Sequence, residues 1–106
     1  MSTRATIAVR RPSGDYLATY LHFDGYPEHA GRLLEEHFLN AEQVEALVDR
    51  GDIRFLHSEI GDPEYYDNGD SPAKLPTRDA LVDYAKNLGA RYLYVFDDAT
   101  WSCLEL

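Results

Sequence analysis

Residues 21–31, LHFDGYPEHAG, bring two histidines, an aspartate, a glutamate and a tyrosine together within eleven residues. His22 and Asp24 would lie on one face of an extended strand, where an imidazole and a carboxylate can act as an acid–base pair. With His29 or His57 nearby, the same two side chains offer the nitrogen and oxygen ligands of a transition-metal site. The stretch therefore has three interpretations: an active site, a metal site, or the turn between a strand and a helix.

The turn explains most of these residues without chemistry. Gly25 supplies the backbone freedom of a tight corner, Asp24 can bond the turn's own amides, and Pro27 suits the first turn of a helix. The histidine spacing matches neither HExxH nor a paired Cys/His pattern, and nothing identifies a nucleophile or an oxyanion hole. We therefore predict no catalytic residue, metal ligand or cofactor. A small hydrolase that uses His22 and Asp24 is the least favoured alternative.

Two hairpins frame the elements that must position these residues. Alternating apolar and polar residues predict a β-hairpin over 4–10 and 16–23, with RPSGD as its loop. A second hairpin is expected over 91–96 and 101–106, joined by the turn DDAT. Between them, residues 53–56 are a candidate for a short strand. Residues 58–75 contain two glycines and two prolines and show no hydrophobic periodicity, which predicts a loop.

Three helices are expected between the hairpins. The first begins at Pro27 and ends near Asn40, which is the expected N-cap of the second. Gln43, three residues on, completes a capping-box pattern, and Gly51 ends this second helix. The third runs from a Thr77 cap to a stop at Gly89.

The resulting order, β-β-α-α-β-α-β-β, predicts one α+β domain over residues 1–106, with a mainly antiparallel sheet and helices packed on one face. The core face of the hairpins would carry Ile7, Val9, Leu17, Leu21, Leu93 and Val95. The opposite face would then carry Tyr16, Tyr20, His22, Tyr92, Tyr94 and Phe96. Such an aromatic face is either covered, by the 58–75 loop or by a second copy in a homodimer, or exposed to bind a ligand.

Charge is the strongest bulk signal. Nineteen acidic residues against ten basic ones give a net charge of −9. Residues 33–75 alone contain eleven acidic and three basic residues, a net charge of −8. Affinity for nucleic-acid phosphates needs cations that displace counterions, so this composition argues against direct nucleic-acid binding. It suits a basic partner, including a basic groove that normally holds nucleic acid, or else it serves solubility.

The segment 58–70 places five acids around two adjacent tyrosines with no lysine or arginine, and the first two helices would extend its negative surface. Carboxylates spaced along a surface, with aromatic anchors, are what a nucleic-acid mimic needs. The expected partner-binding residues are Glu59, Asp62, Glu64, Tyr65, Tyr66, Asp67, Asp70, Glu35, Glu36, Glu42 and Glu45. Alternatively, the same segment is a solvated loop with no binding role. It lacks the register of a calcium-binding loop.

A small-molecule binder that sequesters a nucleotide signal is the alternative from a different class. Bases would stack on the aromatic residues, and phosphates would bind Arg4, Arg10, Arg11 or Arg91. The ligand-binding residues would be Tyr16, Tyr20, His22, Tyr26, Tyr92 and Tyr94.

Location and redox state follow from simpler features. No apolar run approaches the roughly 18 residues that a membrane span needs, and the start MSTRATIAVRR lacks the apolar core of a signal peptide. The single cysteine, Cys103, excludes an internal disulfide and a multi-cysteine zinc site. We expect a cytoplasmic protein with a buried thiol and no membrane partner.

Several short motifs of the chain resemble those of a known group of proteins. Its opening MSTRATIAV, the corner HFDGYPEHAG, the later GDI and the closing aromatic strand with Trp101 resemble a group of small proteins encoded by bacteriophages and prophages. The specific part, the STR-T-I start and the H-[FW]-D-G-Y corner, covers about the first third of the chain. No activity defines that group, so the resemblance assigns no role to His22 or Asp24. It implies a small accessory protein inside a bacterial host cell, binding a host protein or nucleoprotein complex, for example as an anti-CRISPR type of inhibitor.

Overall fold

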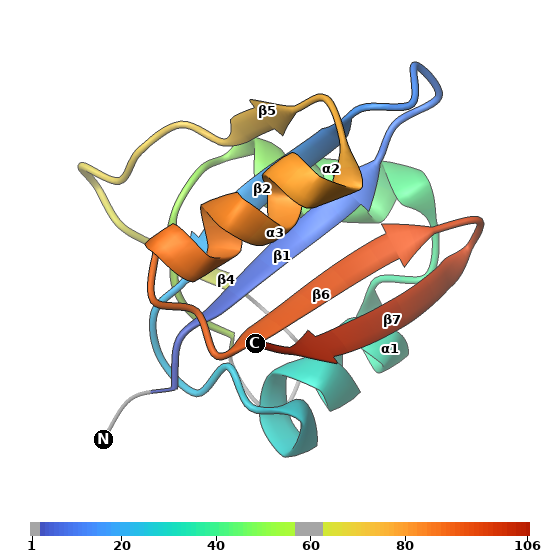
Figure 1. The fold of residues 1–106 in the computed structure, drawn as a ribbon. Coiled ribbons are helices and arrows are strands. Elements are labelled where there is room, and N and C mark those ends of the chain that lie inside the picture. Colours follow the sequence, from blue (N-terminus) through green and yellow to red (C-terminus); the bar gives the residue numbers. More distant parts are fainter. Residues whose placement is uncertain (1–2, 57–62) are drawn as a thin grey trace.

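The first hairpin forms as the alternation predicts, from β1 (Ala5–Arg10) and β2 (Tyr16–Leu21). In the computed structural model, which describes residues 3–56 and 63–106, this hairpin lies in the middle of a seven-stranded sheet (Figure 1). On one side β1 pairs in parallel with β6 (Tyr92–Asp97), and β6 continues into its own hairpin partner, β7 (Thr100–Glu105).

Three short strands complete the other side. β3 (Ile53–Leu56) pairs in parallel with β2, β4 (Pro63–Tyr65) pairs antiparallel with β3, and β5 (Ala73–Leu75) pairs antiparallel with β2. The order along the sheet is β4-β3-β2-β1-β6-β7, with β5 beside β2. Four of the six pairings are antiparallel, which confirms an α+β fold with a mainly antiparallel sheet.

The segment predicted as a loop over 58–75 therefore contains two strands that the sequence order omitted. Both are only three residues long, too short for alternation to reveal them. Pro63 stands at the first residue of β4, an edge strand, where its missing N–H is tolerated.

The helices begin and end close to the predicted residues. A π-helical turn, η1 (Pro27–Gly31), runs directly into α1 (Arg32–His37), and α2 (Ala41–Asp49) follows. The Asn40 side chain caps α2 by accepting from the Gln43 amide at 2.9 Å. The Gln43 side chain accepts from the Leu39 amide at 2.7 Å, one residue before the amide that a capping box would use.

The third helix, α3 (Arg78–Asn87), is capped as predicted by Thr77, whose hydroxyl accepts from the Ala80 amide at 3.1 Å. Gly89 follows its last turn at φ +75°, the left-handed conformation that commonly ends a helix.

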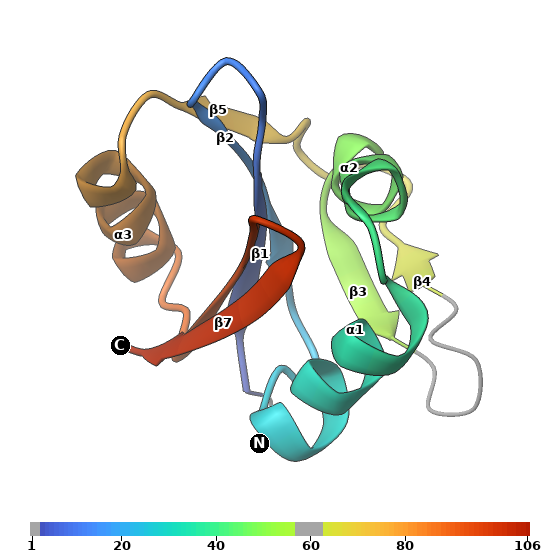
Figure 2. The ribbon, with the colours of Figure 1, turned by 90° about the vertical axis from the view of Figure 1, so that its right-hand side faces the viewer.

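Helices cover both faces of the sheet, so the prediction of helices on one face is wrong. η1, α1 and α2 lie on one side and α3 lies on the other (Figure 2). Two separate apolar clusters result. The first joins the α1 and α2 side chains to alternate residues of the strands: Ile7, Val9, Leu17, Leu21, Tyr94 and Phe96. The second places Leu81 and Ala85 of α3 against Ala8, Ala18, Leu93 and Val95.

The physical reason is the register between β1 and β6. Ile7 pairs with Tyr94 and Val9 pairs with Phe96, and paired residues of neighbouring strands project to the same face. Leu93 and Val95 therefore lie opposite Ile7 and not beside it. Because these strands are apolar on both faces, each face needs a helical cover.

Alanine substitutions at Gly51 and Gly14 test how tightly the 66–72 segment packs against the end of α2. Gly51 contacts this segment, and Gly14 is the control. Both have positive φ, +94° and +91°, but a Cβ on Gly51 would lie 2.5 Å from the carbonyl oxygen of Asp70, whereas one on Gly14 would meet nothing within 4 Å. We expect Gly14→Ala to lower the free energy of unfolding by about 1–2 kcal/mol, the cost of the left-handed conformation alone. Gly51→Ala should cost distinctly more in urea unfolding. Equal losses would show that this segment gives way freely.

Candidate functional site

The corner between β2 and η1 is built by close backbone packing. Asp24 has φ +55°, and the Gly25 amide donates to the carbonyl of Thr3 at 2.8 Å. A Cβ on Gly25 would lie 2.7 Å from the Cβ of Ala5, so glycine permits this approach. The carbonyl of Gly25 in turn accepts from the Tyr94 hydroxyl at 2.6 Å. The structural interpretation of Asp24 and Gly25 thus has a concrete basis.

The histidines of this stretch have separate partners. His22 Nδ1 bonds with the Tyr20 hydroxyl at 2.5 Å, and His29 Nε2 bonds with the carbonyl of Leu56 at 2.7 Å. Within residues 3–56 and 63–106, no hydrogen bond joins His22 to Asp24, and no three His, Cys, Asp or Glu side chains come together as metal ligands. His57 lies outside the described residues.

The aromatic residues do not form the single face that the sequence suggested. Tyr92 and Tyr94 pair with Ala5 and Ile7 and project toward η1, α1 and α2. Tyr16 belongs to the cluster under α3, and Tyr20, four residues along the same strand, projects to that side too. His22 follows the end of β2, and Tyr26 is an exposed residue before η1. The six residues of the nucleotide-binding alternative are therefore divided between the two sides of the sheet.

Charge differs between the two helical layers. Residues 27–49, which span η1, α1 and α2, contain six acids and one base, Arg32, for a net −5. α3 contains two acids and two bases, Arg78 and Lys86, for a net of zero. Among the described residues, five arginines form ion pairs, each of which leaves the net charge unchanged: Arg10–Asp97, Arg11–Asp15, Arg32–Glu36, Arg54–Glu64 and Arg91–Glu105. Residues 27–49 thus carry −5 of the net charge of −9, more than half of it.

The residues expected to contact a partner fall partly on this side. Glu35 and Glu36 are on α1, Glu42 and Glu45 are on α2, Glu64 and Tyr65 are in β4, and Tyr66, Asp67 and Asp70 follow it. The Tyr65 hydroxyl donates to the carbonyl of Leu47 at 2.6 Å, so β4 is attached to α2. Glu59 and Asp62 lie outside the described residues.

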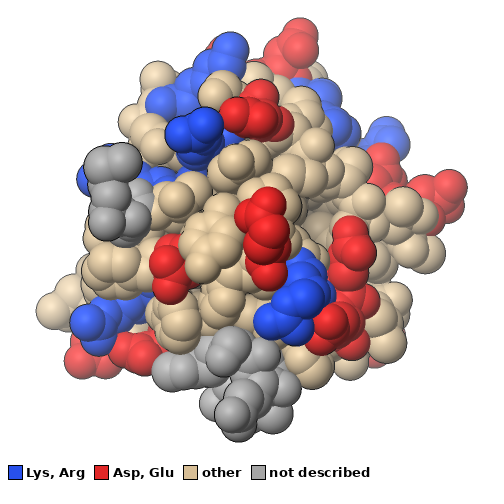
Figure 3. Space-filling view, turned by 90° about the horizontal axis from the view of Figure 1, so that it is seen from below, with Lys and Arg blue, Asp and Glu red and all other residues tan. Residues whose placement is uncertain are grey.

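Several of these side chains are already engaged. Glu36 is 3.1 Å from Arg32, and Glu64 is 2.8 Å from Arg54. The Tyr65 ring lies under the Arg50 guanidinium at 4.1 Å and packs against the core, so it is not a free anchor. At the lower end of the molecule, acidic and basic side chains are interspersed among uncharged ones (Figure 3). The acidic surface is therefore not one continuous sheet of carboxylates.

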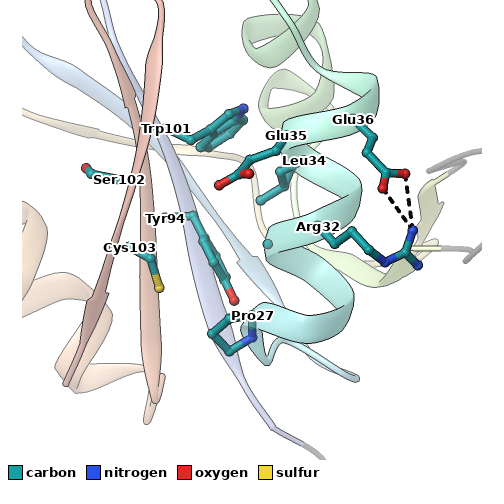
Figure 4. A pocket seen from close by; sticks show the side chains of 10 residues that line it. Pro27, Arg32, Leu34, Glu35, Glu36, Tyr94, Trp101, Ser102 and Cys103 are labelled. Carbon is teal, nitrogen blue, oxygen red and sulfur yellow. Dashed lines mark hydrogen bonds and ion pairs between the residues drawn. The ribbon is translucent and has the colours of Figure 1, made fainter.

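A groove that the sequence did not reveal runs between α1 and β7 (Figure 4). We call it the α1–β7 groove; its main hollow has a volume of about 460 Å³ and is lined by Pro27, Gly31, Leu34, Glu35, Tyr94, Trp101 and Cys103, among others. A second hollow of about 350 Å³ shares Glu35 and Trp101 and extends to Phe38, Leu39 and Thr100. Only the packing of α1 against the β6–β7 hairpin creates this groove, which is why no spacing in the sequence could point to it.

The floor and walls of the groove are fixed by hydrogen bonds. Tyr94 forms the floor with its hydroxyl bound to Gly25, and burial raises the pKa of this phenol, so it stays protonated. The Trp101 indole donates to the carbonyl of Phe38 at 3.0 Å and meets the Phe96 ring edge-on. These contacts make the groove a preformed, partly apolar surface, with the Glu35 side chain pointing toward its floor (Figure 4).

Cys103 was expected to be buried, but as part of β7 it is exposed. Its side chain shares the face of Tyr94, its pairing partner, and points into the α1–β7 groove (Figure 4). Partial burial there raises the pKa of the thiol. The Cys103 thiol is therefore mostly neutral at pH 7 and is not activated as a nucleophile.

A comparison with protein-family models, curated proteins and solved structures finds no match to this chain. None of the described helices has the length and apolar character to cross a bilayer.

Cys103 provides a prediction on reactivity. Because its pKa is raised, the thiolate fraction at pH 7 is below that of an ordinary cysteine. Iodoacetamide should label the folded protein more slowly than the urea-unfolded chain at pH 7, and the difference should narrow as the pH rises through 9. Labelling that is faster in the folded protein at pH 7 would contradict the neutral thiol.

Asp52 provides a prediction on pH. Its carboxylate accepts from the Asp70 amide at 3.1 Å, while burial, with the Asp70 charge as a smaller cause, raises the pKa of Asp52. A raised folded-state pKa means that the charged carboxylate costs stability at neutral pH, and that this cost disappears as protonation proceeds.

Asp52→Asn keeps an oxygen acceptor for Asp70, so it should raise the free energy of unfolding at pH 7. The gain should be smaller at pH 4 than at pH 7, because protonation of Asp52 in the native protein removes the cost of its charge. Urea unfolding of both proteins at the two pH values measures this. A variant that loses stability equally at both would show that the Asp52 charge is harmless.

Proposed function

We propose that this chain is a non-enzymatic binding protein whose acidic α1–α2 side occupies a basic surface of a bacterial protein or nucleoprotein complex. The observation that carries the proposal is the charge difference between the two helical layers, −5 for residues 27–49 against zero for α3. Each layer covers one face of the sheet through its apolar side chains, so packing does not require this difference.

The carboxylates of α2 support a role outside folding. Glu42 and Asp49 are exposed and form no ion pair with the described residues, and Glu45 is only half-buried. Like charges on one helix repel one another. Glu42 in the first turn of α2 and Glu45 near Arg11 gain from positive charge inside the protein, whereas Asp49, in the last turn, does not. A basic partner would compensate these charges, and an exposed row of carboxylates can replace phosphates in a groove that holds nucleic acid.

The setting follows from the resemblance of the opening third to small phage and prophage proteins. In that setting the partner is a host complex in the bacterial cytoplasm, and the consequence of binding is inhibition of a defence system such as a CRISPR effector. The nucleotide-binding alternative receives no support, because its six aromatic residues do not share a surface.

Matched charge reversals test this proposal. Glu42→Lys with Glu45→Lys changes the net charge from −9 to −5, and Asp79→Lys with Asp83→Lys makes the same change on α3. With a partner recovered from bacterial lysate, we expect the α2 pair to weaken binding at least tenfold, about 1.4 kcal/mol, and the α3 pair to do much less. Binding should also weaken from low to physiological salt, since exposed charges are screened over about 8–10 Å.

Calorimetric titration at two salt concentrations makes the comparison, and the melting temperatures of both double variants verify folding. Equal loss in the two variants would reduce the effect to net charge. Binding that ignores both salt and the α2 pair would overturn the proposed function.

A further inference from the structure

β7 is an edge strand of the sheet that the described residues form. Its only neighbour among the described strands is β6; Trp101 and Leu104 are half-buried, and its other four residues are exposed. At six residues it is twice as long as β4, the strand at the opposite edge. A free edge offers unpaired backbone groups to another strand.

The hydrogen-bond pattern between β6 and β7 identifies the unpaired backbone groups of β7. The Leu106 amide donates to the carbonyl of Arg91 at 2.7 Å, and hydrogen-bonded and non-bonded pairs alternate along an antiparallel ladder. The pairs Tyr92–Glu105, Tyr94–Cys103 and Phe96–Trp101 are therefore non-bonded pairs. It follows that the N–H and C=O groups of Trp101, Cys103 and Glu105 point outward from the sheet.

The side chains of the same strand line the α1–β7 groove. Trp101 and Cys103 project to the face of Phe96 and Tyr94, and the groove opens between them and α1 (Figure 4). A strand added beside β7 would thus bond to its outward groups and send every second side chain toward the hollows.

We propose that an extended basic peptide segment binds as an additional strand along β7, with alternate side chains in the α1–β7 groove. This goes beyond the proposed function, because the groove would accept such a segment whether or not α2 contacts a partner. A basic segment complements the charge of the groove. Glu35, Arg32 and Glu36 all line it, but the Arg32 guanidinium is paired with Glu36, whereas Glu35 points toward the sheet (Figure 4). The net charge of these three side chains is −1, and Glu35 carries it. No hydrogen bond or ion pair to another described residue engages the Glu35 carboxylate.

A second copy of the chain is a poorer occupant. It would bring another net charge of −9, with a second Glu35 and Glu105 at the same edge. A cationic side chain, in contrast, can meet the Glu35 carboxylate while its aliphatic part packs on Trp101 and Tyr94.

The test uses synthetic peptides, because these leave the protein unchanged. The probe is an acetylated and amidated octapeptide of alternating lysine and valine, and the control replaces each lysine with glutamate. Titration into ¹⁵N-labelled protein should shift the amides of β7 and α1, and the glutamate peptide should not. In a strand, N–H groups of alternate residues face one neighbour. Two N-methylated peptides test this, one methylated at every valine amide and the other at every lysine amide. The peptide whose methyl groups face β7 should cause no amide shifts, and the other should bind within about threefold of the unmethylated peptide.

Charge reversal provides the matched protein control. Glu35→Lys should weaken the lysine peptide at least fivefold, and Asp83→Lys, with the same change in net charge on α3, less than twofold. Because Glu35 and Asp83 are both exposed, the ¹⁵N-correlation spectra of the two variants should retain the chemical-shift dispersion of the native protein.

Three results would overturn the inference: absence of binding, equal effects of the two N-methylated peptides, or amide shifts confined to residues outside β7 and α1. A dimer in light scattering whose β7 amides are protected without peptide would also overturn it, since a second copy would then fill the edge. Loss of partner binding in the α2 double variant, with peptide binding intact, would separate this groove from the proposed function.

Discussion

The parallel pairing of β1 with β6 decides which side chains meet in both cores. By aligning Ile7 with Tyr94, it brings the aromatic residues of β6 under α1 and leaves Leu93 and Val95 for α3. The Tyr94 hydroxyl then reaches the carbonyl of Gly25, which ties the sheet to the corner before η1. The position of α1, and with it the groove beside β7, depends on this one register.

Local signals in the sequence were sufficient for most of the elements. The hairpins follow from alternation, and the caps at Asn40 and Thr77 follow from side-chain chemistry that acts over three residues. Such features need no knowledge of the rest of the chain. The α+β class, with a mainly antiparallel sheet, follows from their order.

What the sequence could not provide are the relations between distant elements. A shift of one residue in strand register exchanges the two faces, and strands that are apolar on both faces, as β6 is, give no signal to choose between them. The division of Tyr16 from Tyr94 and the helix on the second face come from that choice. The groove was missed for the same reason, since Glu35 and Cys103 line the same hollow only after α1 has packed.

The two hairpins stand at opposite ends of the chain, and each supplies one strand to the central parallel pair. Neither can bury its apolar faces alone, so we expect cooperative folding to await the arrival of β6, whose pairing closes a loop of most of the chain. A chain cut between β5 and α3 would give a long N-terminal fragment and a short C-terminal one, with complementary strand edges at β1 and β6. Association of the two fragments would restore both hydrophobic cores together. The chain is therefore suited to a split-protein reporter, in which folding reports that the fragments have been brought together.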